Sequence, residues 1–195
     1  MDRRDVLKWM GTTVVSGTLQ AHVRANATSQ VPAGMARFDP AFATAVETLD
    51  AIRKKRISAR ELLDITFQRI DRHNPKINAI IWQFRDQAAV RARAADEALA
   101  HGRSLGDLHG LPVTIKESFA YRDSPNTWGL LSLKDVRSPR TAVAVERLEA
   151  AGAIVVGKTN VPVLLRDHQS FNPIYGTTNN PWDLTRTPGR AKERP

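Results

Sequence analysis

Residues 152–159 read GAIVVGKT and match, letter for letter, the pattern G-x-x-x-x-G-K-[ST] of phosphate-binding loops. In a working loop of this kind, backbone N–H groups between a strand and a helix converge on the phosphates. Here the variable positions are apolar and mostly β-branched, which predicts that residues 154–156 are themselves a buried strand. An extended strand directs its N–H groups sideways to its neighbours, so it cannot surround an anion. Residues 157–160 are then expected to form the turn that leaves the strand.

The flanking residues support the same interpretation. Residues 141–151 carry Val145, Leu148 and Ala151 at helical spacing, so a helix stands where a nucleotide-binding loop needs its strand. Gly152 lies where a left-handed glycine ends such a helix. Pro162 disfavours a long helix starting at Lys158, because the residue before a proline avoids the helical region. We therefore expect no nucleotide binding.

Helices and short apolar strands alternate along the rest of the chain. Ala45, Leu49 and Ile52 have helical spacing and precede a basic run at 53–56. A second helix begins at the capping box of Ser58 and Glu61, and Asn74-Pro75 is expected to stop it. Residues 77–84 and 113–115 read as strands, residues 87–100 as a helix, and the chain from 172 onward as loops. This order predicts an α/β fold with a partly parallel sheet.

Composition narrows the classes of partner and cofactor. The 195 residues are 42% hydrophobic and 25% charged, as in a globular protein. The net charge of +9 is spread along the chain without interleaved aromatic residues, so we expect no nucleic-acid partner. The absence of cysteine excludes disulfides and thiolate metal sites from this sequence. Four of the histidines show no metal-ligand spacing, and we expect neither metal nor cofactor: His73, His101, His109 and His168.

Four segments in order resemble the amidase signature family of serine hydrolases. They are LHGLPVTIKE at 108–117, AAGAIVVGKTN at 150–160, NPIYGTTNNPWD at 172–183 and RTPG at 186–189. The resemblance covers roughly residues 40–189. It implies that a full-length relative hydrolyses the C–N bond of a small-molecule carboxamide through a Ser–Ser–Lys arrangement. The implied fold is α/β, with this chain as the N-terminal part of a mixed sheet layered between helices.

The resemblance places the family's catalytic lysine at Lys116, on the strand after the H-G-x-P turn. A serine hydroxyl must lose its proton as it attacks an amide, and a lysine can accept that proton only when it is neutral. Burial disfavours the charged form, so Lys116 is expected at a buried strand end. Lys158 is expected to be a positioned or solvated lysine at the end of its strand. Asp107, Glu117 and Asp123 are expected to be solvated or to cap turns, and Ser118 to share the face of Lys116 if the strand continues.

In the family, the two catalytic serines lie in glycine- and serine-rich segments that follow the position of Gly189. This sequence continues instead as a basic tail, residues 190–195. A frameshift or premature stop in a longer coding sequence would produce such a junction, and we expect the chain alone to be an inactive part of an amidase. The alternative is a non-enzymatic fragment that associates with another chain.

The N-terminal residues suggest an export signal. Arg3-Arg4 precedes a modestly apolar stretch at 9–19 and then Ala25-Asn26-Ala27, an A-x-A cleavage pattern. This order resembles a twin-arginine signal, which directs a protein to the periplasm or beyond without a membrane anchor. We therefore divide the chain into a signal at 1–27, a linker at 28–40, a truncated amidase domain at 41–189 and an atypical tail at 190–195. Nothing in the sequence predicts an oligomeric state.

Overall fold

A computed structural model describes residues 38–189, all within one compact unit that spans Arg37–Pro195. The predicted export signal at 1–27, most of the linker and the tail at 190–195 lie outside the described residues. Of the described helices, none is both long and apolar enough to cross a bilayer.

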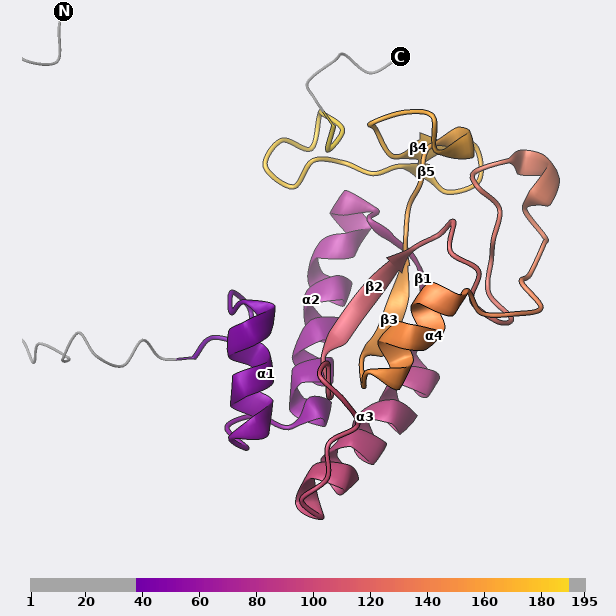
Figure 1. The fold of residues 1–195 in the computed structure, drawn as a ribbon. Coiled ribbons are helices and arrows are strands. Elements are labelled where there is room, and N and C mark those ends of the chain that lie inside the picture. Colours follow the sequence, from indigo (N-terminus) through magenta and orange to yellow (C-terminus); the bar gives the residue numbers. More distant parts are fainter. Residues whose placement is uncertain (1–37, 190–195) are drawn as a thin grey trace, which may run out of the picture. The chain divides into compact units, whose positions relative to one another are not determined.

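Four helices and a three-stranded sheet form the body of the domain (Figure 1). In chain order they are α1 (Ala45–Arg53), α2 (Ala59–Ile77), β1 (Ile80–Gln83), α3 (Arg85–Ala100), β2 (Pro112–Lys116), α4 (Val143–Ala150) and β3 (Ile154–Thr159). The strand order is β1-β3-β2, in which β2 runs parallel and β1 antiparallel to β3. The predicted mixed α/β fold is confirmed.

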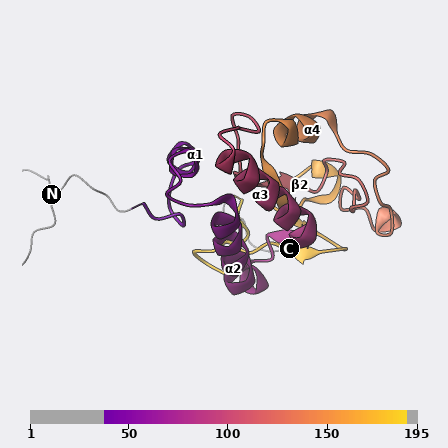
Figure 2. The ribbon, with the colours of Figure 1, turned by 90° about the horizontal axis from the view of Figure 1, so that it is seen from below.

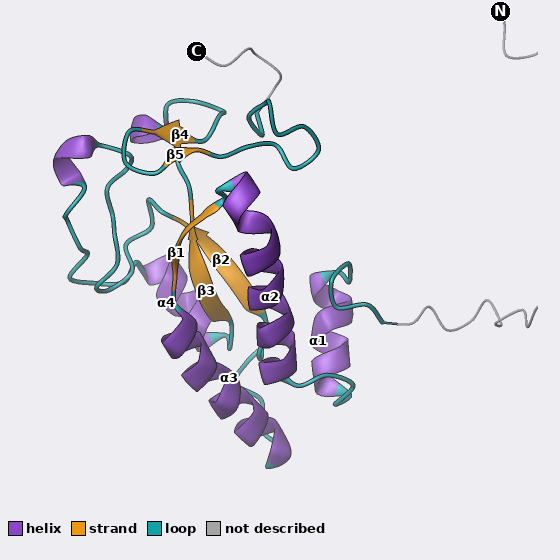
Figure 3. Cartoon of the chain, turned by 180° about the vertical axis from the view of Figure 1, so that it is seen from behind, coloured by secondary structure: helices purple, strands orange, loops and turns teal. Residues whose placement is uncertain are grey.

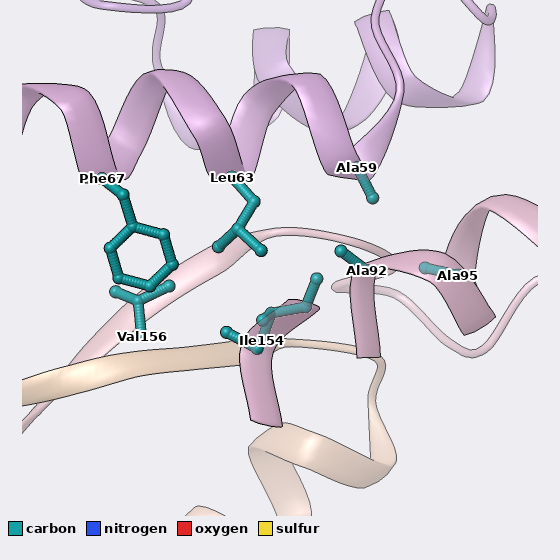
Figure 4. Close-up of a cluster of buried hydrophobic side chains, with 8 residues drawn as sticks. Ala59, Leu63, Phe67, Ala92, Ala95, Ile154 and Val156 are labelled. Atoms are coloured by element: carbon teal, nitrogen blue, oxygen red, sulfur yellow. The ribbon is translucent and has the colours of Figure 1, made fainter. Parts of the chain in front are cut away.

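The sheet lies between two helical layers. Helices α2 and α3 cover one face and stand before the sheet in Figure 3, while α4 covers the other face and stands before it in Figure 1. Leu63 and Phe67 of α2 point toward Ile154 and Val156 of β3, with Ala92 of α3 beside them (Figure 4). The alanines of α3 allow that helix to approach closely. On the opposite face, a second cluster gathers side chains from β2, β3, α4 and the junction of β1 with α3: Ile115, Val155, Val145 and Phe84.

Helix α1 lies at the side of α2 (Figure 2) and packs through a third apolar cluster of Ala51, Ile52, Ile57 and Leu62. The capping box predicted at the start of α2 is present. The Glu61 N–H donates to Ser58 Oγ at 3.1 Å, and the Ser58 N–H donates to a carboxylate oxygen of Glu61 at 2.8 Å. Asp96 of α3 accepts from the N–H groups of Ala59 and Arg60, and so ties the start of α2 to α3.

The prediction that Asn74-Pro75 stops the second helix was wrong. Helix α2 continues through Pro75 to Ile77 and ends at Asn78, whose φ of 54° is left-handed. Asn74 instead connects the helix to β1, because its side-chain oxygen accepts from the N–H groups of Ala79 and Ile80. Because Pro75 has no N–H to donate to the carbonyl oxygen of Asp71, α2 continues with one hydrogen bond fewer.

The segment after residue 172 is not wholly loop. A short antiparallel pair, β4 (Phe171–Asn172) with β5 (Gly176–Thr177), lies beyond the carboxyl ends of β2 and β3 (Figure 1). A buried polar network attaches it to the body: the Asn160 side-chain amide donates to Gly176 O and Thr178 Oγ1, and its oxygen accepts from the Asn172 amide at 2.8 Å. This anchor fixes the hairpin beside the ends of the parallel strands.

The octet GAIVVGKT forms a helix end and a strand, as predicted, but the strand is longer than expected. Gly152 has a φ of +95° just after α4, and β3 then runs to Thr159. The prediction of a turn at 157–160 was wrong, since residues 157–159 still pair with β1 and β2. The strand absorbs the extra residue through a bulge: Val113 pairs with Val155, but Thr114 pairs with Gly157.

Candidate functional site

The carboxyl ends of β2 and β3 meet at one edge of the sheet, and a lysine stands at each. Lys116 is the last residue of β2 and pairs with Thr159, while Lys158 pairs with Ile115. In open α/β sheets, ligands bind outside the carboxyl ends of parallel strands, so this edge is the candidate site.

Lys116 is exposed, contrary to the expectation of a buried strand end. Its two neighbours, Ile115 and Glu117, are buried, and adjacent residues of a strand point to opposite faces. Lys116 therefore extends from the face opposite to α4, between two residues with buried side chains and paired with β3. Its ammonium group makes no hydrogen bond or ion pair with residues 38–189, so it can reach a ligand at the sheet edge.

Lys158 was expected to be positioned or solvated, and since it is fully buried, the solvated alternative is wrong. The bulge in β3 explains why. After the extra residue, Lys158 shares a face with Ile115 and Val155, under α4 and the loop that follows β2. Its Nζ donates to the carbonyl oxygen of Pro125 and to Ser124 Oγ at 3.2 Å. Burial lowers the pKa of Lys158 to about 8, and the nearby Glu117 opposes part of that shift.

Glu117 is also fully buried, so the solvated alternative expected for it is wrong. Its two carboxylate oxygens accept from the backbone N–H groups of Thr127 and Trp128, at 2.5 and 3.1 Å. Asp107 and Asp123 are exposed, as predicted. Sequence reasoning missed Glu117, and the available signal was its position one residue beyond an apolar strand, on the same face as Ile115.

Lys158 and Ser124 are hydrogen-bonded, and a lysine beside a serine can act as a base and a nucleophile. Their burial and hydrogen bonds decide whether they do so. Both residues are fully buried. The Ser124 hydroxyl donates to the carbonyl oxygen of Tyr121 at 2.6 Å, so its proton is already engaged. A substrate has no access to this pair in the folded domain, which makes its role structural.

Ser118 does not extend the face of Lys116, because the chain turns after β2 and Phe119 N–H donates to Lys116 O at 3.0 Å. The histidines are dispersed. His109 is buried in the turn before β2, where burial lowers its pKa and its Nδ1 accepts from the Leu105 N–H. His73, His101 and His168 are exposed. Within residues 38–189, no group of three His, Asp or Glu side chains could hold a metal ion.

Comparison with known proteins identifies the fold around this edge. The Amidase family model matches residues 61–190. Indoleacetamide hydrolase of Bradyrhizobium diazoefficiens is 42% identical over 146 residues, which cover 75% of this chain and 28% of that protein. A glutamyl-tRNA(Gln) amidotransferase subunit from Anaeromyxobacter sp. is 39% identical over 138 residues, or 71% of this chain and 28% of that protein.

Solved structures agree with the sequences. A bacterial aryl acylamidase of the amidase signature family superposes with a TM-score of 0.71 at 28% identity, over 75% of this chain and 31% of that one. A 6-aminohexanoate cyclic dimer hydrolase superposes with a TM-score of 0.69 at 28% identity, over 78% and 30%. The chain thus spans less than a third of the length of these relatives. Since the family model matches most of the chain, this protein belongs to the amidase signature family.

Proposed function

We propose that this chain supplies the lysine-bearing part of an enzyme that hydrolyses carboxamide C–N bonds, with Lys116 as the proton acceptor for a serine nucleophile. The observation that carries the proposal is the position of Lys116: an exposed lysine at the carboxyl end of a parallel strand, in a domain of the amidase family. Its fixed backbone and free side chain suit a group that must meet a nucleophile from elsewhere in the enzyme. The relatives named above support small amides as the substrate class.

We further propose that the 195-residue polypeptide does not hydrolyse amides by itself. The sequence contains no glycine- and serine-rich segment of the kind that the family resemblance assigns to the nucleophile. Without a nucleophile and oxyanion donors, a lysine supplies only part of the catalytic machinery. Release of ammonia from indole-3-acetamide by purified 1–195, lost on Lys116→Ala, would contradict this statement.

The role of Lys116 can be tested in a complete enzyme. A chimera would carry the 146 residues of this chain that align with indoleacetamide hydrolase in place of the corresponding hydrolase segment. The chimera should release ammonia from indole-3-acetamide, and Lys116→Ala should abolish the release. The matched control is Lys134→Ala, which removes another exposed lysine. Full turnover in the Lys116→Ala chimera would refute the assignment.

Association with another polypeptide is a second candidate function. In the described domain β1 and β2 are the outer strands of the sheet, and outer strands present unpaired backbone groups. A groove beside β2 is lined by apolar residues that include Ile70, Ile80 and Val113. Sedimentation of purified 1–195 separates the cases: a discrete complex with a second chain favours this role, whereas polydisperse aggregation speaks against it.

Export is a separate proposal, because it depends on residues 1–27. The order of the arginine pair, the apolar stretch and the A-x-A site supports a twin-arginine signal. A fusion of residues 1–40 to a periplasmic reporter should be exported, and replacing Arg3 and Arg4 by lysine should block export. Equal export of both fusions would refute the signal.

A further inference from the structure

Two buried charges hold the loop that follows Lys116. We refer to residues 117–128 as the 117–128 loop. At its start, Glu117 accepts from the backbone at its end, Thr127 and Trp128. Between them, Lys158 of β3 donates to the hydroxyl of Ser124 and the carbonyl of Pro125. The loop is therefore closed on itself by a carboxylate and supported from the sheet by an ammonium group.

Apolar packing alone does not account for the position of this loop. Its fully buried members are Glu117, Ser124, Pro125 and Thr127, of which only the proline is apolar, while Phe119 and Trp128 are exposed by 43% and 41%. Tyr121 also holds the loop, because it packs against Phe84 and donates to Glu149. The buried centre of the loop is held by hydrogen bonds to the two buried charges. Such bonds are stronger than those between neutral groups and more directional than apolar contacts.

Burying a lysine is costly, and a hydrophobic residue of similar volume often serves stability better at such a place. The fold nevertheless builds a site for this ammonium group. Gly157 lies in the bulge just before Lys158 and allows β1 to approach closely: a Cβ at this position would stand 2.5 Å from the carbonyl oxygen of Trp82. An expensive charge with a dedicated backbone feature indicates a function beyond filling space.

The loop connects this charge to Lys116. The N–H of Glu117 donates to Thr159 O at 3.0 Å and continues the pairing of β2 with β3 by one residue. The carboxylate of the same residue closes the loop. Any loosening of the loop therefore reaches the peptide unit that directly follows Lys116, whereas the preceding residue, Ile115, is fixed in the apolar cluster under α4.

We infer that Lys158 is a positioning residue that acts on Lys116 through the 117–128 loop and Glu117. The inference rests on the proposed role of Lys116 as the proton acceptor. Lys158 touches no substrate in this scheme. Its ammonium group holds the loop so that the backbone after β2, and with it the direction of the Lys116 side chain, is set before a substrate arrives.

The absence of cysteine allows the charge to be separated from the packing. The Lys158→Cys variant of the 195-residue chain would be alkylated in denaturant and refolded. 2-Bromoethylamine yields a side chain with the length and charge of lysine, and 1-bromopropane yields one of the same length without charge. Amide hydrogen exchange at pH 7 then compares three loop positions, Glu117, Thr127 and Trp128, with Leu63 and Ala92 of the helical layer.

We expect the propylated protein to exchange at the three loop amides at least tenfold faster than wild type, while the two helical amides stay within twofold. The aminoethylated protein should match wild type within threefold at all five positions. Equal protection in both alkylated forms would overturn the inference, since the charge would then be irrelevant. An equal acceleration at all five amides in the propylated form would also overturn it, because Lys158 would then serve global stability alone.

Ser124→Ala provides a second variant if the alkylated proteins do not refold. It removes one acceptor of Lys158 and leaves both charges in place. Acceleration confined to the three loop amides supports the inference, and unchanged exchange refutes it. Because these measurements need no substrate, they can succeed or fail independently of the hydrolysis assay on the chimera. Lys116→Ala should leave the exchange pattern unchanged, which separates the positioning group from the group that it positions.

Discussion

Lys116 and Lys158 end neighbouring parallel strands, pair with adjacent residues and yet occupy opposite environments. Lys116 is exposed on one face of the sheet edge, and Lys158 is fully buried beneath the loop on the other face. Both residues are lysines, but Lys116 is the last residue of β2 and Lys158 is the last but one of β3, so the two are offset by one residue in the pairing. The difference arises from the face that each side chain occupies, so a chemical role cannot be assigned to a strand-end lysine until its face is known.

The largest expected effect separates the two lysines by activity. In the chimera with indoleacetamide hydrolase, Lys116→Ala should lower kcat/KM by about 10³-fold, since a positioned general base contributes roughly 10²–10⁴-fold. Ammonia release under steady-state conditions measures this loss. A loss for Lys134→Ala of similar size would show that the assay responds to any lysine and would remove the contrast.

Substitution of Gly157, in the bulge before Lys158, should destabilise the strand that carries the buried lysine and leave the surroundings of Lys116 unchanged. In Gly157→Ala the new methyl group would clash with the Trp82 carbonyl oxygen, which belongs to rigid backbone. We expect a loss of about 3 kcal/mol in the free energy of unfolding, the upper end for overpacked positions. Urea denaturation measures it, and Gly102→Ala is the control, because a Cβ there meets nothing within 4 Å although its φ of +70° adds some strain. Equal costs at the two glycines would argue against the bulge as the critical feature.

The burial of Lys158 also predicts that the free energy of unfolding depends on pH. Burial lowers the pKa of Lys158 from 10.5 to about 8 in the folded protein, so between these values the unfolded chain binds more protons than the folded one. Stability from this group therefore rises with pH. We expect wild type to gain about 2 kcal/mol between pH 7 and pH 9.5 relative to Lys158→Met. Parallel stability curves for the two proteins would show that Lys158 is not buried as a charged group.

The smallest expected effect is that of Lys116 on the stability of the domain. Lys116→Met should change the free energy of unfolding by less than about 0.5 kcal/mol, because substitutions at exposed positions without buried partners rarely do more. Thermal unfolding of purified 1–195 is sufficient to measure this change. A cost above about 1 kcal/mol would mean that Lys116 makes contacts in the folded domain and would weaken its description as a free side chain.

Much of the fold follows from local sequence patterns. The capping box of Ser58 and Glu61, the helix-ending Gly152 and the apolar strand at 154–156 were predicted because each depends on neighbouring residues. The continuation of α2 through Pro75 was not predictable in this way. It depends on the side chain of Asn74, which receives the backbone of the next strand.

The candidate site was harder to predict for a related reason. Lys116 was identified from its family motif, but its exposure depends on which face of β2 meets α4. The burial of Lys158 depends on a bulge in β3 that is defined by its pairing with β2. Glu117 is buried through bonds to residues ten and eleven positions away. Contacts of this kind are set by tertiary structure, and no single stretch of sequence records them.

The bulge decides which face of the sheet each later side chain of β3 occupies. Before it, Ile154 and Val156 belong to the layer of α2 and α3, and after it the count of residues no longer alternates with theirs. If the same residues alternated throughout, without the bulge, every residue after Val156 would lie on the opposite face. Lys158 would then move to the side of Leu63 and Phe67, where the structure offers an ammonium group only apolar neighbours. In this segment the number of residues therefore carries as much chemical information as their identity.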